Sequence, residues 1–596
     1  MVNVKTSAFM CVRRRGARNA SLVLALFGAS SLRAFVCPFD VVPAPREIVV
    51  REGCYKAPAD FFRDLSSTWT KDGSLPPEGY RIEVDASGVR IFGADAAGAF
   101  YAVETLKQIV PTNDIGQTHY RIGWLRRQVS PTTKIFPGVS KSGIEIYAQI
   151  RAAAKTGYTI PFVTVRDWPE YPWRGVMLDT GRNYQSKDAT LKLLDLMARF
   201  KFNVFQMHFT EDQGWRLEIP GMPELVKYGA VRPKSIRFAT GITYPEGFDG
   251  PGVWEYDDET NGPFYYRPKD IADICAYAKA RHIKVVPEIE MPGHCRAFLA
   301  AYPEFSCRGA ELPRVPRSAI GIEKDVLCVG NDAAVRKLEE IFDYVCRVFP
   351  DSDVIHVGGD ECQTDRWKEC PKCQAKMKKE GLKNERELQS WIVRHFSDYM
   401  KAKGRRIMGW DGILNGHELD APQTIVHFRQ PRPGCRAKTA AEAAALGHEV
   451  VYGPTDYTFC NRSQGIDEDP HFYRHWASDP VTAEMMYWFD PRKDCPERDR
   501  ARILGSQLNG FGGFTTGRAD MEWKFWPRGC AMAETLWLGE DKPGYEDFYK
   551  RMQPIRREMI AEHVNCARLS EPVGRQEQES ADQSQSEGWR AFMPDL

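Results

Sequence analysis

The sequence predicts an α/β protein whose larger part is a (β/α)8 TIM-type barrel, preceded by a small α/β accessory domain. Three observations lead to this fold class. Eight short apolar runs, rich in β-branched residues, recur between Gly175 and Leu508. Amphipathic helical patterns lie between most of these runs. Polar residues follow several runs directly, as they do at the working end of a barrel.

The chain begins with the pattern of an export signal. Basic residues Arg13–Arg15 precede an apolar stretch from Ala20 to Ala29, and small residues continue to Ala34. We therefore predict a signal peptide over residues 1–36 and a periplasmic or extracellular location. The stretch is too short for a stable transmembrane helix, and no later run reaches ~18 apolar residues, so no membrane span is expected in the mature chain.

Composition narrows the class of partner. The 596 residues include 81 basic and 80 acidic side chains, a net charge of +1. This balance does not favour nucleic acid or an anionic membrane surface as the partner. The length exceeds that of one ordinary domain. Many of the 15 tryptophans are expected in the core, but a surplus of Trp and Tyr also fits stacking on the faces of sugars.

Residues 38–165 are predicted to form the accessory domain. Two alternating strands, Arg81–Val84 and Gly88–Gly93, are joined by a short polar turn, and Ala94–Val110 has a helical pattern. A connector rich in Pro and Trp then marks a boundary. We place the barrel at residues 166–562, and the polar, Gln- and Ser-rich residues 563–596 are predicted to be a disordered tail.

The eight predicted barrel strands are short apolar runs bounded by polar or helical sequence. They are Gly175–Asp179, Val204–His208, Val285–Ile289, Val354–Val357, Arg406–Trp410, Thr424–Phe428, Glu449–Tyr452 and Arg502–Leu508. The clearest helical patterns between them are Asp188–Lys201, Lys269–Arg281, Ala333–Phe349 and Glu385–Gly404. Residues that directly follow the strands are candidate site residues, because the active site of such a barrel lies at the strand carboxyl ends.

The fourth strand has the most informative ending. Val354–Val357 runs into two glycines and then Asp360 and Glu361. The glycines let the backbone bend and a ligand approach. Adjacent carboxylates repel, which favours keeping one protonated, as a general acid requires. An acidic helix N-terminus explains the same pair. Similar endings elsewhere shift the balance toward a site: Arg182, then Glu211 and Asp212, then His294, and Trp410 with Asp411.

In order and spacing these motifs resemble glycoside hydrolase family 20, the β-N-acetylhexosaminidases. The matching segments are Arg174–Tyr184, His208–Trp215, Pro287–His294, His356–Glu361, Gly409–Asp411 and Pro527–Glu534 with Trp537. The resemblance covers residues 161–540 throughout and the accessory domain loosely. It implies an exo-acting glycosidase that removes terminal β-linked N-acetylhexosamine from a glycan, with no cofactor and no metal.

The resemblance also implies roles for single residues. In this family the acetamido oxygen of the substrate attacks the anomeric carbon, an exception to the two-carboxylate rule. Glu361 would be the general acid, and Asp360 would orient the acetamido group. His294, with Glu211 or Asp212, would form a relay beneath Glu361. Arg182 would hold sugar hydroxyls, and Trp410, next to Asp411, would wall the acetamido pocket.

Several positions depart from the family pattern on the later strands. Phe459 stands where the family has a Tyr that donates to the acetamido oxygen, and losing such a donor costs roughly 3 kcal/mol of transition-state stabilisation. Tyr457 could replace it only if the loop is rearranged. The remaining substitutions lie where the family binds sugar: Asn461 for Asp, Phe511 and Phe428 for Trp, and Gly513 for Glu.

These departures leave alternatives open. One is a non-catalytic or weakly active protein that binds N-acetylhexosamine on the same barrel. Another is a hydrolase with two separated carboxylates, with Asp411 or Glu290 as nucleophile. A metal-dependent hydrolase is disfavoured, because no two histidines are placed as ligands on adjacent strand ends. The motifs do not fix the sugar epimer, the linkage or the oligomeric state.

The cysteines carry a separate expectation. Cys370 and Cys373 have the spacing of metal ligands, but the sequence lacks a second CxxC or a nearby pair of histidines. We therefore expect a short-loop disulfide or two structural thiols here, rather than zinc. The surrounding segment, Trp367–Gln374, resembles bacterial members of the family, which supports a structural role.

Overall fold

A computed structural model describes residues 37–65, 68–110, 157–240, 253–257, 259–319, 321–416, 418–430, 435–465, 480–513 and 515–573. The predicted signal peptide lies outside these residues, as does the predicted tail from residue 574 onward. The first part of that tail is packed, contrary to the prediction. Val564, Cys566 and Leu569 are buried, and Arg556 of α18 (Tyr545–Ala561) donates to the backbone of Cys566 and Ala567.

The accessory domain is a five-stranded sheet with the strand order β1-β5-β3-β4-β2. Its elements are β1 (Glu47–Ala57), α1 (Phe61–Asp64), β2 (Thr70–Lys71), β3 (Tyr80–Asp85), β4 (Gly88–Gly93), α2 (Ala96–Ile109) and β5 (Tyr158–Asp167). Helix α2 begins where the Asp95 side chain accepts from the amide of Gly98 at 2.8 Å, a typical N-cap. The predicted pair of strands and the helix after them are confirmed.

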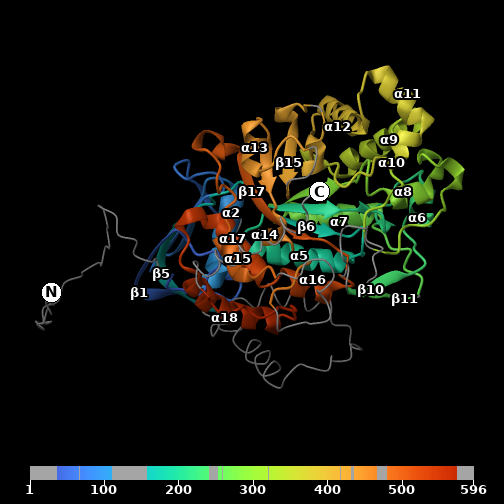
Figure 1. Ribbon diagram of the computed structural model, residues 1–596. Coiled ribbons are helices and arrows are strands. Elements are labelled where there is room, and N and C mark those ends of the chain that lie inside the picture. Colours follow the sequence, from blue (N-terminus) through green and yellow to red (C-terminus); the bar gives the residue numbers. More distant parts are fainter. Residues whose placement is uncertain are drawn as a thin grey trace, which may run out of the picture.

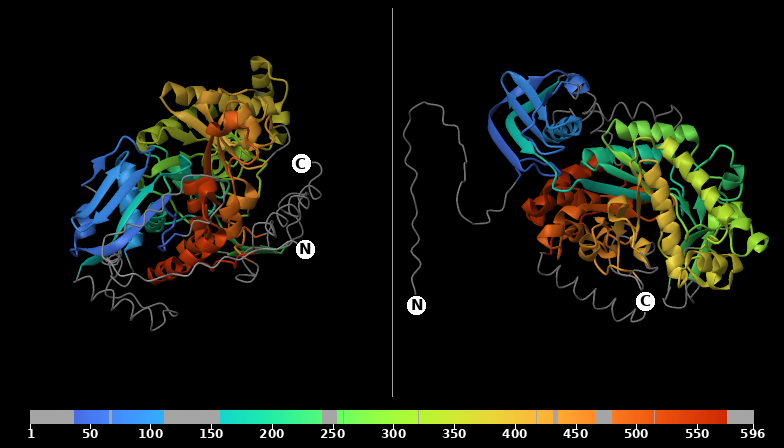
Figure 2. Two further views of the ribbon diagram at one scale, coloured as in Figure 1. Left: turned by 90° about the vertical axis from the view of Figure 1, so that its left-hand side faces the viewer. Right: turned by 90° about the horizontal axis from the view of Figure 1, so that it is seen from above.

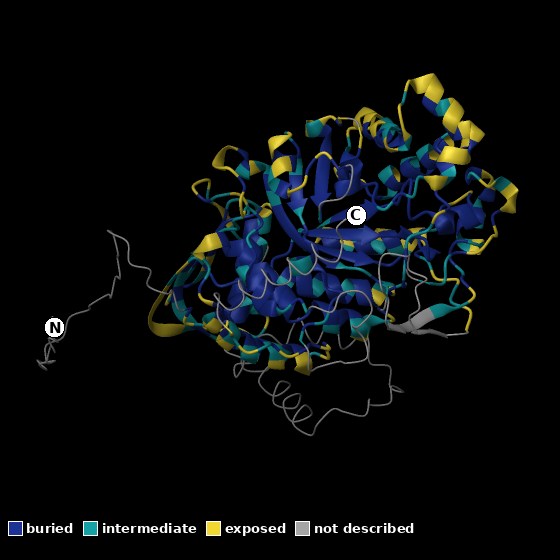
Figure 3. Ribbon diagram, in the orientation of Figure 1, coloured by how far each residue is buried: buried dark blue, intermediate teal, exposed yellow. Residues whose placement is uncertain are grey.

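The larger part is a closed barrel of eight parallel strands, as predicted (Figure 1). The strands are β6 (Trp173–Asp179), β7 (Val204–His208), β12 (Lys284–Glu288), β13 (Val354–His356), β14 (Arg406–Trp410), β15 (Thr424–Phe428), β16 (Glu449–Tyr452) and β17 (Ile503–Gly510). Most of their residues are apolar and nearly all are buried, because every strand is covered on both faces (Figure 3).

Helices connect most of the strands on the outside of the barrel. They are α5 (Lys187–Arg199), α7 (Pro268–Lys279), α9 (Asp332–Val348), α12 (Glu385–Ala402), α13 (Ala440–Ala445), α15 (Ala483–Trp488) and α17 (Arg528–Leu538). Between β14 and β15 the described residues form only the 3-10 turns η4 (Asp411–Leu414) and η5 (Ala421–Gln423). The four helices predicted from periodicity are all present.

The longer insertions lie after β7, β12, β13, β16 and β17. They contain β8 (Thr210–Glu211), β9 (Gly214–Trp215), α6 (Pro223–Lys227), β10 (Ser235–Thr240), β11 (Val253–Asp257), α8 (Arg296–Ala301), η2 (Pro303–Phe305), η3 (Gly309–Glu311), α10 (Asp365–Glu369), α11 (Pro371–Glu380), α14 (Thr455–Thr458), η6 (Glu497–Arg502), α16 (Arg518–Phe525) and η7 (Gly539–Asp541). These segments supply much of the candidate site and of a cysteine cluster described below.

The barrel interior changes character along its axis. One layer is apolar and packs residues from seven strands: Trp173, Val204, Val286, Val354, Met408, Ile425 and Val451. Toward the strand carboxyl ends the interior becomes polar. There, Gln206 donates to Glu288 and accepts from Gln507, and His356 contacts the same Glu288 carboxylate at 3.0 Å. The apolar layer closes the barrel, and the polar layer forms the floor of the site.

The accessory domain lies against the barrel (Figure 2), and a buried ion pair joins the two. Lys201, after α5, lies 3.1 Å from Asp167 at the end of β5, and both side chains are fully buried. The indole of Trp537 donates to the same Asp167 at 2.9 Å. Arg174 of β6 pairs with Glu78 at 2.7 Å. Among the described helices, none combines the length and the apolar character needed to cross a membrane.

Candidate active site

The parallel register brings four polar strand-end residues to one level. Asp179 lies opposite His208, His208 opposite Glu288, and Glu288 opposite His356. All four are fully buried. The His208 ring lies 3.5 Å from both Glu288 and Glu290. This layer of acidic and imidazole side chains lies under the residues that line the barrel mouth. Pairing of the acids with the imidazoles makes the burial of these groups possible.

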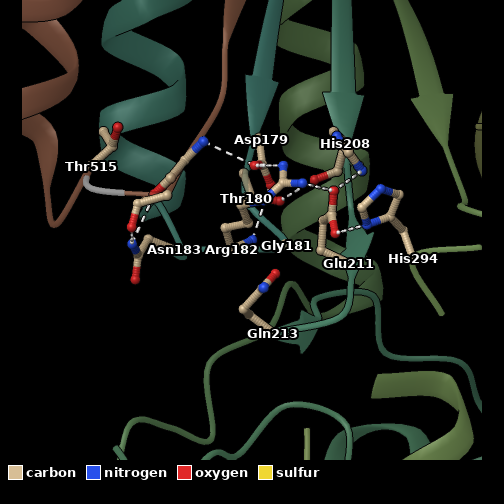
Figure 4. Close-up of polar contacts among 12 residues, drawn as sticks. Asp179, Thr180, Gly181, Arg182, Asn183, His208, Glu211, Gln213, His294 and Thr515 are labelled. Atoms are coloured by element: carbon tan, nitrogen blue, oxygen red, sulfur yellow. Dashed lines mark hydrogen bonds and ion pairs between the residues drawn. The ribbon is translucent and has the colours of Figure 1, made fainter. Parts of the chain in front are cut away.

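Arg182 lies between two carboxylates at the mouth. It contacts Asp179 at 2.7 Å and Glu211 at 2.6 Å, and Figure 4 shows Glu211 between Arg182 and His294. Burial alone would lower the pKa of Arg182, but the carboxylates of Glu211 and Asp179 raise it above its usual range. The guanidinium is thus fixed as a cation with little freedom to reorient.

His294 contacts acidic side chains through both of its ring nitrogens. Its Nδ1 lies 3.0 Å from Glu211 and 3.2 Å from Asp212, and its Nε2 lies 3.2 Å from Glu361. Both acids that the sequence offered as partners therefore contact the imidazole. Burial opposes the charged form, yet these carboxylates, Glu211 first, raise the pKa of His294 well above its usual range. A protonated imidazole donates from both nitrogens and so fixes the Glu361 carboxylate in position.

His294 and Glu361, which contact each other, share a rare backbone conformation. His294 has φ 46° and Glu361 has φ 48°, in the left-handed region that residues other than glycine seldom adopt. Such strain persists only where the surrounding structure enforces it, and it clusters at functional sites. The Glu361 side chain retains 19% of its exposure, whereas Asp360 retains 5%, so Glu361 is the acid that faces the open mouth.

Asp360 is held by one oxygen only. Its Oδ2 lies 2.6 Å from Arg429, which follows β15 and is itself bound by Asp411 through the backbone amide at 3.2 Å. The other oxygen, Oδ1, is buried without a hydrogen-bond partner among the described residues. The Nε2 atom of His294 lies 4.0 Å from this oxygen. Asp360 therefore presents a fixed, vacant acceptor toward the site.

The indole of Trp410 is fixed from below. Its Nε1 donates to Glu288 at 2.9 Å and approaches Glu290 at 3.3 Å, while the ring stacks on His427 at 4.0 Å. Burial, together with Asp360 and Glu288, raises the pKa of Glu290 well above its usual range. A protonated Glu290 is a poor nucleophile, which weighs against its role in a two-carboxylate mechanism.

Gly358 leaves space for the side chain of Glu290. Its φ is 68°, and a Cβ at this position would meet Glu290 Oε2 at 1.7 Å. The glycine ahead of the acid pair therefore serves both the bend predicted from the sequence and the close approach of a neighbouring carboxyl group. A larger residue at this position would force the Glu290 side chain or the strained backbone to move.

Aromatic rings line the opposite side of the mouth. Phe511 lies 4.8 Å from Phe459 and 5.6 Å from Trp410, and the Arg182 guanidinium lies 5.3 Å from the Phe511 ring. The sequence-predicted residues Phe459 and Phe511 are thus together with Trp410 and Arg182. Phe459 has no hydroxyl, so this side of the mouth presents an aromatic ring at the position where the family pattern has a hydrogen-bond donor.

Three other predicted residues lie at the edge of this group. Phe428 is 2% exposed and packs on Tyr452 in the core, and Tyr457 stacks on Phe489 at 5.2 Å. Both rings therefore contact aromatic side chains outside the pair of Phe459 and Phe511. Asn461 is nearly buried, and its Oδ1 has no hydrogen-bond partner among the described residues. Asn461 thus has an acceptor to offer, whereas Phe428 and Tyr457 contribute packing.

Sequence reasoning missed two residues that position the site. Asp179, the last residue of a predicted strand, binds Arg182 and also accepts from the amide of Gly512 at 2.8 Å, which ties β6 to the loop after β17. The strand-end rule could have found it. Arg429 follows Phe428 at the end of the sixth strand, and the same rule applied to that strand would have included it.

The chain matches family models over most of its described length. The model described as glycosyl hydrolase family 20, catalytic domain, matches residues 171–540, and the model for domain 2 of the same family matches residues 41–168. A beta-hexosaminidase of Porphyromonas gingivalis is 32% identical over 490 residues, which cover 81% of this chain and 54% of that protein.

Other relatives give the same picture. A beta-hexosaminidase of Vibrio furnissii is 31% identical over 63% of this chain and 58% of its own length. The chain thus spans little more than half of each of these two curated relatives. The crystal structure of a beta-N-acetylhexosaminidase from Bacteroides fragilis superposes with a TM-score of 0.67, at 25% identity, and covers 89% of this chain and 97% of that one.

Proposed function

Because the chain belongs to glycoside hydrolase family 20, we propose that it is an exo-acting β-N-acetylhexosaminidase that removes terminal β-linked N-acetylhexosamine from glycans. The observation that carries the proposal is the Asp360–Glu361 pair. One acid is buried with a single vacant oxygen, and the other faces the mouth in contact with a cationic imidazole. This asymmetry suits two different roles for two adjacent carboxyl groups.

The geometry supports substrate-assisted chemistry with retention of configuration. Asp360 Oδ1 accepts the acetamido N–H and turns the acetamido oxygen toward the anomeric carbon. That oxygen attacks as the bond to the leaving group breaks, and Glu361 protonates the departing oxygen. Positive charge then develops on the oxazolinium ring, and the Asp360 carboxylate stabilises it. Glu361, now ionised, takes a proton from the water that opens the ring and releases the sugar.

The other side chains act by holding these two acids. Arg429 fixes Asp360 Oδ2, so Oδ1 is the oxygen of this carboxylate that can accept from the acetamido group. His294 orients Glu361, and Glu211 with Asp212 keeps the imidazole charged. Arg182 is saturated by Asp179 and Glu211 on one side and presents its remaining N–H groups to sugar hydroxyls.

Hydrolysis of a small chromogenic panel tests the proposal. The panel contains the nitrophenyl β-glycosides of N-acetylglucosamine, 6-sulfated N-acetylglucosamine, N-acetylgalactosamine and glucose. We expect turnover of acetamido sugars alone. Asp360→Asn should reduce it about 10²–10³-fold, because the substituted amide can no longer stabilise the cationic ring. Asp398→Asn, on the outer helix α12, is a matched control that should retain full activity.

The other outcomes are informative. Turnover of the glucoside would contradict the acetamido mechanism and favour two separated carboxylates. Saturable binding of N-acetylglucosamine without turnover would favour a binding protein, an interpretation that the missing hydroxyl at Phe459 supports. Export to the periplasm or the extracellular space is part of the proposal; fractionation of cells that express the full chain, with mass spectrometry to detect removal of residues 1–36, tests it.

A further inference from the structure

Four cysteine thiols converge at one point outside the candidate active site. The sulfur atoms of Cys307, Cys328, Cys370 and Cys373 all lie within 4.8 Å of one another. Three of the four residues are buried and Cys307 is partly exposed. They come from three segments: the loop after η2, the loop ahead of α9, and the first turn of α11 with its N-cap. All four are free thiols.

The spacing of the sulfurs matches a tetrahedral metal site. Cys328 lies 3.6 Å from Cys370 and 3.7 Å from Cys373, and Cys307 lies 3.8 Å from Cys373. With Zn–S bonds of about 2.3 Å, the edges of a regular tetrahedron of four sulfurs around zinc are about 3.8 Å long. A disulfide holds its sulfurs about 2 Å apart, so none of these three contacts has disulfide geometry.

We propose that Cys307, Cys328, Cys370 and Cys373 bind one Zn²⁺ ion in a closed, structural site made of four thiolates. On binding, each thiol releases its proton and each sulfur donates an electron pair to the metal. A full tetrahedral set of protein sulfurs leaves no open position for water or substrate, which separates this site from catalysis. The inference does not depend on the proposed hydrolase activity.

The convergence of four sulfurs also favours a cation at their centre. Four thiolates placed this close together repel one another, and a divalent ion offsets that repulsion and keeps the sulfurs deprotonated.

The cluster joins the two loops that carry the relay. The amide of Leu327, beside Cys328, donates to Pro292 at 3.0 Å, two residues before His294. The indole of Trp367, three residues before Cys370, donates to Leu327 at 2.8 Å. These contacts link the loop after β12, which holds His294, to the loop after β13, which holds Glu361.

The backbones at the cluster also approach very closely. A Cβ on Gly330 would lie 2.1 Å from the carbonyl carbon of Lys372, so the Cys328 loop and the CxxC turn touch with no side chain between them. A zinc ion bound here would therefore hold the loop that carries His294 against the loop that carries Glu361.

This proposal departs from our expectation from the sequence. Zinc was disfavoured because Cys370 and Cys373 lack a second CxxC or a pair of histidines nearby. The other two ligands come instead from single cysteines 42 and 66 positions away, Cys328 before Cys370 and Cys307 before Cys373. Only the fold brings them together, so a search for closely spaced ligand pairs does not detect them.

Metal content of the purified full-length protein tests the proposal. We expect one zinc per chain by inductively coupled plasma mass spectrometry, and loss of that zinc in Cys328→Ser and Cys373→Ser. Cys54→Ser and Cys530→Ser, which remove an exposed thiol and a buried thiol elsewhere, should keep it. In protein refilled with Co²⁺, the wild type should show the visible absorption of tetrahedral cobalt thiolate, and Cys307→Ser a shifted spectrum.

Two results would overturn the proposal. One is metal-free protein in which mass spectrometry after alkylation finds these four cysteines as two disulfides. The other is iron instead of zinc, which would reassign the same sulfurs to a redox centre. If the buried variants do not fold, the wild-type metal content and the spectrum of Cys307→Ser, whose side chain is partly exposed, still decide the question.

Discussion

The two sides of the barrel mouth are built from different materials. On the side of β6, β7, β12 and β13, charged groups touch one another at 2.6–3.2 Å: Arg182, Glu211, Asp212, His294 and Glu361. On the side of β16 and β17, the contacts are between rings, and Phe459 and Phe511 are 4.8 Å apart. Asp360, held by Arg429 of the sixth strand, stands where the sides meet.

The difference shows which side of the site is fixed by several ionic contacts at once and which side is held by packing. The charged residues of the first side share a network of ionic contacts, so one substitution there leaves another charge buried and unpaired. The ring side is held by packing, which tolerates exchange of one aromatic group for another of similar volume. Proton transfer is thus assigned to the rigid side, and the choice of sugar to the adaptable one.

The largest expected effect comes from the rigid side. Glu361→Gln should lower kcat on a disaccharide about 10²–10⁴-fold, because the substituted amide cannot protonate the leaving oxygen. The loss should shrink on a nitrophenyl substrate, whose leaving group needs little protonation. Steady-state kinetics on both substrates measure the difference.

Glu290→Gln is the matched control for this prediction. Glu290 is buried, and its surroundings raise its pKa well above the usual range, so an amide of the same shape should cost far less activity than Glu361→Gln. If the Glu290 variant were the more damaged of the two on both substrates, a nucleophilic role for Glu290 would replace our assignment.

The next-largest loss of activity is expected at Arg429 and Asp360, where the two sides of the mouth meet. Arg429→Met should lower kcat about 10-fold or more, because Asp360 loses the cation that fixes Oδ2 and can turn its vacant oxygen away from the acetamido group. The change should be alike for good and poor leaving groups, unlike that of Glu361→Gln. Arg492→Met, which removes a cation paired with Glu170 far from the mouth, controls for general loss of stability.

The ring side should respond by gaining activity. Phe459→Tyr adds a hydroxyl where the family pattern has one, and it should raise kcat/KM on acetamido sugars by about 10-fold, a part of the factor that one transition-state donor supplies. Phe489→Tyr, on the ring that stacks against Tyr457, adds a hydroxyl outside this contact and should have no such effect. Unchanged kinetics in Phe459→Tyr would mean that the wall selects a different substituent on the sugar.

The smallest effect is one of stability against pH. The pKa of His294 is raised well above its usual range by Glu211 and its neighbours, so the folded state binds the proton more tightly than the unfolded state. The resulting stabilisation is complete below about pH 6.5 and is lost as pH rises through the folded-state pKa. Thermal unfolding between about pH 6 and 9 should show a falling Tm that flattens in His294→Gln.

The fold was predictable because each strand is buried on both faces and reads as a short, mostly apolar run, such as Val204–His208. The relay was predictable for a similar reason: Glu211, Asp212 and His294 directly follow strands. Arg429 was not, because its partner Asp360 comes from two strands earlier along the chain. The cysteine cluster was not, because its contacts join loops whose lengths carry no periodic signal.

The buried Lys201–Asp167 pair has a consequence for engineering this protein. Either part expressed alone would keep one unpaired charge at a surface built to be dry, and the barrel alone would also expose the indole of Trp537. Breaking such a pair costs about 3–5 kcal/mol. The sheet and the barrel therefore form a single cooperative unit, and exchanging the sheet between relatives should succeed only if the new sheet supplies an aspartate that meets Lys201 and Trp537.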